Sequence, residues 1–111
     1  MPQEFALGQN APNPFNPTTI INYQLPVESY VTIKIYNMLG QEVATLVDEL
    51  QSAGYKTARF NGSELSSGVY FYRMTAYPST GSTGSPLAGS GSPSTGSGQG
   101  FSESKKLVLV K

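Results

Sequence analysis

Short segments in which apolar and polar residues alternate, separated by turn residues, constrain the fold of this chain most. The clearest of them cover residues 18–25, 30–36 and 68–74. Segment 30–36 places β-branched residues on one side and polar residues on the other, as a half-buried strand does. Segment 68–74 has apolar residues on both sides, which predicts a central strand.

The weaker segments extend this pattern to the whole chain. We expect further strands at residues 5–10, 41–47, 55–60 and 105–111. Pro26 ends one strand, and Asn37–Gly40 and Asn61–Gly62 are expected to form hairpin turns. About seven short strands with turn signals about every 8 to 12 residues are typical of a β-sandwich. The sequence therefore predicts an all-β fold, an immunoglobulin-like antiparallel β-sandwich of about seven strands, in a single domain spanning residues 1–111.

The composition excludes several classes of function. The formal net charge is zero and the seven basic residues are scattered, so we expect no nucleic-acid partner. No apolar run approaches the 18 residues that a membrane-spanning helix needs. The chain has neither cysteine nor histidine, so thiolate ligands, zinc sites and histidine-based triads are excluded. We expect no cofactor.

Carboxylates are the remaining catalytic option, and their positions do not favour catalysis. Asp48 and Glu49 are sequence neighbours, so on a strand their side chains point to opposite faces. A glycosidase needs two facing carboxylates in a cleft. The other acidic residues show no pairing that a sequence can reveal. We therefore expect that the protein is not an enzyme.

The segment from residue 78 to 100 differs from the rest of the chain. Twenty of its 23 residues are Ser, Thr, Gly or Pro. Such a composition cannot bury enough apolar surface to offset the entropy of ordering it. We expect a flexible loop between the last two strands. Closing it in place of a four-residue turn costs roughly 1.5 kcal/mol, which the fold can tolerate.

A proline-rich segment precedes the second strand. Residues 11–17 contain three prolines, which exclude a helix and a central strand. We expect Pro14, Phe15, Asn16 and Pro17 to form a structural clasp in which Phe15 caps one end of the core.

Four motifs in this order resemble the C-terminal sorting domain of the type IX secretion system, in its type A form. They are Asn10–Thr19, Asn37–Val43, Ser67–Arg73 and Lys105–Lys111. The resemblance covers the chain except residues 78–100, where the loop is longer than is usual in that family. It implies an immunoglobulin-like sandwich, related in fold to a domain of the flagellar hook-capping proteins.

The resemblance implies an export function. A cargo domain on the N-terminal side would be carried through the periplasm and across the outer membrane of a Gram-negative bacterium. Its partners would be the outer-membrane secretion machinery and, in many members, a surface sortase that removes the domain and joins the cargo to lipopolysaccharide. The protein would be secreted or held at the cell surface. We expect a monomer.

Candidate recognition residues lie in the last two motifs. Gly68 and Tyr70 also have a simple structural role, with glycine turning the chain and tyrosine packing inward. Lys105, Lys106 and Lys111 on a terminal strand either protect an edge from aggregation or help a receptor that adds a strand. Both interpretations of the lysines stay open.

Two other functions compete with a sorting signal. A row of outward-facing aromatic residues would suit a carbohydrate-binding module of a secreted enzyme. Its candidate members are Tyr30, Tyr36, Tyr55 and Phe71. A structural spacer domain is the other alternative. Both kinds of module also occur inside longer chains, whereas this chain stops on the terminal strand, which favours the sorting signal.

Overall fold

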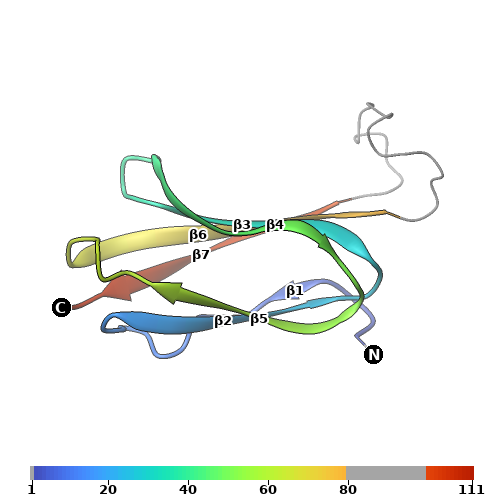
Figure 1. The fold of residues 1–111 in the computed structure, drawn as a ribbon, viewed down its shortest axis with the longest axis horizontal. Helices are drawn as coiled ribbons and strands as arrows, with labels where there is room; N and C mark the ends of the chain where they lie inside the picture. The colour runs from blue at the N-terminus through green and yellow to red at the C-terminus, as the bar shows by residue number, and fades with distance from the viewer. Residues whose placement is uncertain (1, 80–99) are drawn as a thin grey trace.

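The computed structural model describes residues 2–79 and 100–111, and it places seven strands in two facing antiparallel sheets (Figure 1). The three-stranded sheet has the order β1-β2-β5 and consists of β1 (Ala6–Leu7), β2 (Thr18–Leu25) and β5 (Gly54–Asn61). The four-stranded sheet has the order β4-β3-β6-β7 and consists of β3 (Ser29–Tyr36), β4 (Glu42–Gln51), β6 (Gly68–Pro78) and β7 (Phe101–Leu109). The predicted all-β antiparallel sandwich of about seven strands is confirmed.

Alternation along the strands forms the core between the two sheets. Every second residue of β3 is buried, and β6 supplies the buried row Tyr70, Tyr72, Met74 and Ala76. These side chains meet apolar residues of β2 and β5 across the space between the sheets. β6 pairs with both β3 and β7, so it is the central strand that its two apolar faces predicted.

The connections decide which strands pair. The turn Asn37–Gly40 joins β3 to β4 as a hairpin, with Gly40 at a φ of 85°, as predicted. The hairpin predicted at Asn61–Gly62 is wrong, because β5 and β6 belong to different sheets. The Asn61 side chain instead accepts the Ser63 amide at 2.8 Å. The chain turns there and crosses to the other sheet, with Leu65 packed against the core.

Three strands are longer than their sequence patterns predicted. β4 continues to Gln51, β6 to Pro78, and β7 already begins at Phe101. Pairing with neighbouring strands explains this, because the β3–β4 and β6–β7 ladders continue through polar residues such as Asp48 and Ser102. Pro78, predicted as the first residue of the loop 78–100, is therefore the last residue of β6, and residues 80–99 of that loop lie outside the described residues. The part of the chain that the structure describes contains no helix long and apolar enough to cross a membrane.

Candidate recognition surface on the last strand

β7 is an edge strand whose two faces differ. Leu107 and Leu109 are buried in the core, as the sequence predicted. Residues 102, 104, 106 and 108 have side chains on the other face. In a strand, the residues that share one face also direct their backbone groups to one edge. The backbone groups of these even-numbered residues therefore face away from β6.

The proline-rich segment covers the C-terminal half of this edge. The amide of Phe15 donates to the carbonyl of Val108 at 2.9 Å, and the amide of Val110 donates to the carbonyl of Phe15 at 2.9 Å. The Asn13 side chain accepts the amide of Val108 at 3.0 Å. Prolines at positions 14 and 17 keep this stretch out of a helix. Phe15 thus forms an isolated parallel bridge with β7, and the Asn13 side chain adds one further contact to the same edge.

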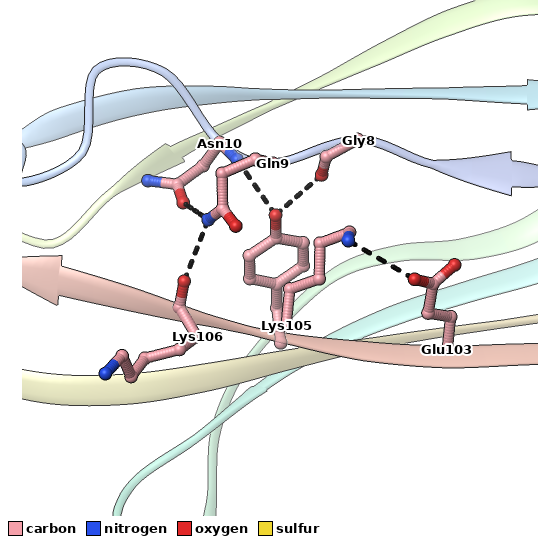
Figure 2. A network of polar contacts seen from close by, with 7 residues as sticks. Gly8, Gln9, Asn10, Glu103, Lys105 and Lys106 are labelled. Atoms are coloured by element: carbon pink, nitrogen blue, oxygen red, sulfur yellow. Dashed lines mark hydrogen bonds and ion pairs between the residues drawn. The ribbon is translucent and has the colours of Figure 1, made fainter.

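The side chain of Gln9 extends this contact along β7 to Lys106. Figure 2 shows Nε2 of Gln9 reaching both the carbonyl of Lys106, at 2.9 Å, and Oδ1 of Asn10, at 2.7 Å. We name residues 9–15 the clasp, because together they pair with the β7 edge from Lys106 to Val110. The clasp predicted at residues 14–17 therefore starts earlier in the chain.

Phe15 anchors the clasp in the core. Its side chain is 2% exposed, and its ring lies 5.9 Å from the ring of Phe60. A Cβ atom on Gly62 would come within 3.2 Å of Leu109 and 3.5 Å of Phe15. The close packing at this end of the sandwich therefore leaves little room for a side chain at position 62.

A buried tyrosine holds the start of the clasp. The hydroxyl of Tyr72 donates to the carbonyl of Gly8 at 2.6 Å and accepts the amide of Asn10 at 2.9 Å. Burial raises the pKa of Tyr72 to about 12, the bond from Asn10 opposes this rise, and the charge of Glu103 adds to it. Sequence reasoning missed this role of Tyr72, because its partners lie more than 60 residues away in the chain.

The other half of the β7 edge is open. The backbone groups of Ser102 and Ser104 and the amide of Lys106 face this edge. Among residues 2–79 and 100–111, no backbone or side-chain group on the side away from β6 forms a hydrogen bond with any of them. An open stretch of unpaired N–H and C=O groups is what an extended segment of a partner can pair with.

The three candidate lysines lie in three different surroundings. Lys105 is on the inner face and forms an ion pair with Glu103 at 3.2 Å (Figure 2). Lys106 is exposed on the outer face. Lys111 lies beyond the strand, where its Nζ donates to the carbonyl of Ser63 at 2.7 Å. The structure thus brings them near one strand without forming a single cluster.

Gly68 and Tyr70 occupy the start of β6. Gly68 has a φ of 156°, which residues with a side chain rarely adopt, although no atom lies within 4 Å of where its Cβ would be. Tyr70 is buried, and its hydroxyl donates to the carbonyl of Ser66 at 2.8 Å. Tyr70 thus packs inward with its hydroxyl at the edge of the core.

The aromatic row expected for a carbohydrate-binding face does not exist as one surface. Tyr55 lies on the three-stranded sheet, whereas the other three residues lie on the four-stranded sheet. Tyr30 and Tyr36 are at opposite ends of β3, and only Tyr36 stands beside Phe71. Alternation predicts which face of its own strand a residue occupies, but it does not predict which sheet the strand joins.

The acidic residues also lie apart. The Asp48 carboxylate accepts the hydroxyl of Tyr30 at 2.6 Å, which raises the pKa of that tyrosine. Glu49 instead accepts the side-chain amide of Gln51 at 2.9 Å. Within the part of the chain that the structure describes, no three acidic side chains gather closely enough to hold a metal ion.

Comparison with known proteins identifies the family. No curated protein and no solved structure matches the chain, and the relation to immunoglobulin-like domains and to type A members stays a prediction. The family model of the secretion system C-terminal sorting domain matches residues 11–83. That span contains most of the clasp, the β3–β4 hairpin and the whole of β6. The chain therefore belongs to the family of secretion system C-terminal sorting domains.

Proposed function

We propose that this domain carries an N-terminal cargo across the outer membrane by the type IX pathway, and that the secretion machinery holds it through the open half of the β7 edge. The observation that carries this proposal is the division of one edge into two halves. The clasp pairs with Lys106 to Val110, and Ser102 to Lys106 is left available. Strand addition to such an edge supplies affinity through backbone hydrogen bonds.

The positions of the chain ends decide which half of β7 lies near the cargo. The chain begins at one end of the sandwich and β7 finishes at the other (Figure 1). A cargo joined before β1 would therefore leave the end formed by the clasp and the last residues of β7 free. The open half of β7 lies at the cargo end, because the rings of Phe5 and Phe101 stack 5.4 Å apart, so the linker to the cargo has to leave this edge accessible.

The chemistry of the described residues favours a role as a signal. The acidic side chains lie apart, and their hydrogen-bond partners are ordinary surface groups. We infer that the domain itself is not an enzyme. Any cleavage of the domain, and any joining of the cargo to a surface lipopolysaccharide, would be the work of a separate sortase.

A proline substitution at one residue tests the edge directly. The amide of Ser104 faces the open edge, so Ser104→Pro removes an outward donor while leaving the pairing with β6 in place. Ser104→Ala is the matched control, because it loses only the hydroxyl that accepts Nε of Arg73 at 3.3 Å. Each variant is fused behind a reporter that carries a signal peptide, and its surface fraction is measured in a type IX-competent host.

We expect Ser104→Ala to export normally and Ser104→Pro to be folded but poorly exported. Normal export of a folded Ser104→Pro variant would contradict strand addition at this edge. A second variant, in which Lys105, Lys106 and Lys111 are all replaced, tests the role of the lysines apart from that of the backbone edge. Poor export of that folded variant would assign them a recognition role, and normal export would leave them as edge protection.

A further inference from the structure

A groove lies on the outer face of the four-stranded sheet, beside the β3–β4 hairpin. Its volume is about 500 Å³, and Phe71, Arg73, Tyr36 and Met38 are among its lining residues. Tyr36 and Phe71 are directly opposite each other in the register of β3 and β6. Their aromatic rings therefore come from neighbouring strands, on the side of the sheet that faces away from the core.

The hairpin that ends the groove is held rigidly while it exposes apolar side chains. The Asn37 side-chain oxygen accepts the amides of Leu39 at 2.8 Å and Gln41 at 3.0 Å. The amide of Gly40 donates to the carbonyl of Asn37 at 3.0 Å. Met38 and Leu39 are nevertheless 68% and 82% exposed. An ordered turn that holds large apolar side chains in water is typical of a contact surface.

The charges around the groove are unbalanced. Arg73 is two residues from Phe71 on the same face of β6, and Lys106 is opposite Phe71 on β7. Within residues 2–79 and 100–111, neither cation forms an ion pair. Lys34, the third cation on this face, is already paired with Glu42 at 3.3 Å. Phe71 is thus flanked by two positive charges without a negative partner.

Hydrogen bonds hold the nearby carboxylate away from these cations. Glu42 accepts the hydroxyl of Thr45 at 2.8 Å and pairs with Lys34, and both contacts lower its pKa. Glu42 therefore stays ionised and committed to its own neighbours. Glu42 thus leaves Arg73 and Lys106 free to pair with a negative charge on a bound molecule.

We propose that this groove binds an acidic peptide segment carrying one large apolar side chain, as a second contact on the outer face of the sheet next to the β7 edge, with Ser104 belonging to both. The apolar side chain would lie against Phe71, Tyr36 and Met38. A carboxylate beside it would pair with Arg73, whose guanidinium can form two parallel hydrogen bonds to it. A flat lipid surface suits the groove less well, because the hairpin stands up at its end and limits contact to something narrow.

Peptide binding to the purified chain tests this proposal. The probe is a fluorescein-labelled peptide, Gly-Ser-Asp-Phe-Asp-Ser-Gly, followed by fluorescence anisotropy at low salt. One matched peptide replaces both aspartates with asparagine, and another replaces phenylalanine with alanine. We expect a dissociation constant below about 1 mM for the probe and at least about fivefold weaker binding for each matched peptide. Added salt should weaken the binding of the probe.

Variants with controls on the other sheet locate the binding. Phe71→Ala and Arg73→Gln should each weaken binding at least about fivefold. Tyr55→Ala removes an exposed aromatic ring and Arg59→Gln an exposed guanidinium on β5, and both should leave binding unchanged. Circular dichroism checks that each variant is folded. Arg73→Gln, at an exposed position, keeps the test valid if Phe71→Ala fails to fold.

Three outcomes would overturn the proposal. They are no binding of the probe, equal binding of the asparagine peptide, and full binding by a folded Arg73→Gln variant. A fourth would replace it, namely binding of vesicles of phosphatidylglycerol and phosphatidylethanolamine through Phe71 and Arg73 without any binding of the peptide. Export is not measured here, so the groove and the β7 edge can fail independently.

Discussion

Phe15 and Leu109 form a parallel β-bridge that joins the segment before the second strand to the last strand. Both side chains are buried in the same hydrophobic core. The C-terminal strand is therefore completed by residues near the other end of the sequence. A change in the clasp should alter the last strand without touching any residue of that strand.

Truncating the anchor of the clasp should destabilise the domain strongly. Phe15→Ala removes a buried ring that packs on Phe60, and such a change lowers the free energy of unfolding by about 3–5 kcal/mol. Urea denaturation measures the loss, with Leu39→Ala as the exposed control at within about 0.5 kcal/mol. The amides of Val108 and Val110 should also exchange faster with deuterium. Unchanged exchange there would contradict the role given to the clasp.

Removing one hydroxyl should release the start of the clasp. Tyr72→Phe leaves the carbonyl of Gly8 and the amide of Asn10 without their partner, at a cost of about 2 kcal/mol in unfolding free energy. Tyr55→Phe removes a hydroxyl from a side chain that is 72% exposed and serves as the control. Equal stability of the two variants would show that water replaces the lost bonds.

Alkaline pH should weaken the same network. The pKa of Tyr72 is about 12 in the folded domain, against an ordinary value of 10.0. Below pH 10 the phenol is protonated in both states, so its contribution to stability is fully present. As the pH rises from 10 toward 12 the unfolded state ionises first, so stability falls by up to about 1.4 kcal/mol per pH unit.

The comparison with Tyr72→Phe isolates this effect from other titrating groups. The stability advantage of the natural protein over the variant should shrink as the pH rises through this range. Unfolding by urea at a series of pH values measures it. An advantage that stays constant up to pH 12 would contradict the raised pKa.

The two faces of β7 should respond differently to alanine. Leu107→Ala and Leu109→Ala empty core positions and should each cost about 2–4 kcal/mol of unfolding free energy. Lys106→Ala changes an exposed side chain and should shift that free energy by no more than about 0.5 kcal/mol. Thermal and urea unfolding of the three variants compare them. A large loss for Lys106→Ala would mean that its stem packs on the sheet.

Local patterns predicted the strands well where alternation was strong. The strand predicted to end at Pro26 does so, and the hairpin turn at Asn37–Gly40 forms with a positive φ at Gly40. The first residues of β7 escaped prediction, because Ser102 and Ser104 carry no apolar signal. Only pairing with β6 makes them a strand.

The recognition surface was harder to predict than the fold. The sequence indicated three lysines as candidate recognition residues. Their surroundings depend on the fold, because Lys105 pairs with Glu103 and Lys111 bonds to the carbonyl of Ser63. The same limit applies to the clasp. The prolines predicted a segment that is neither a helix nor a central strand, whereas its pairing with Val108 depends on where β7 lies in the sheet.

Export of a fused reporter tests the central claim most directly. Residues 3–111 are placed behind a reporter that carries a signal peptide, and the surface fraction is measured in a type IX-competent host. An established sorting domain and a version lacking β7 serve as positive and negative controls. We predict that the complete domain brings the reporter to the cell surface and that the version without β7 does not. A reporter that stays in the periplasm while the established domain delivers its own would contradict the account.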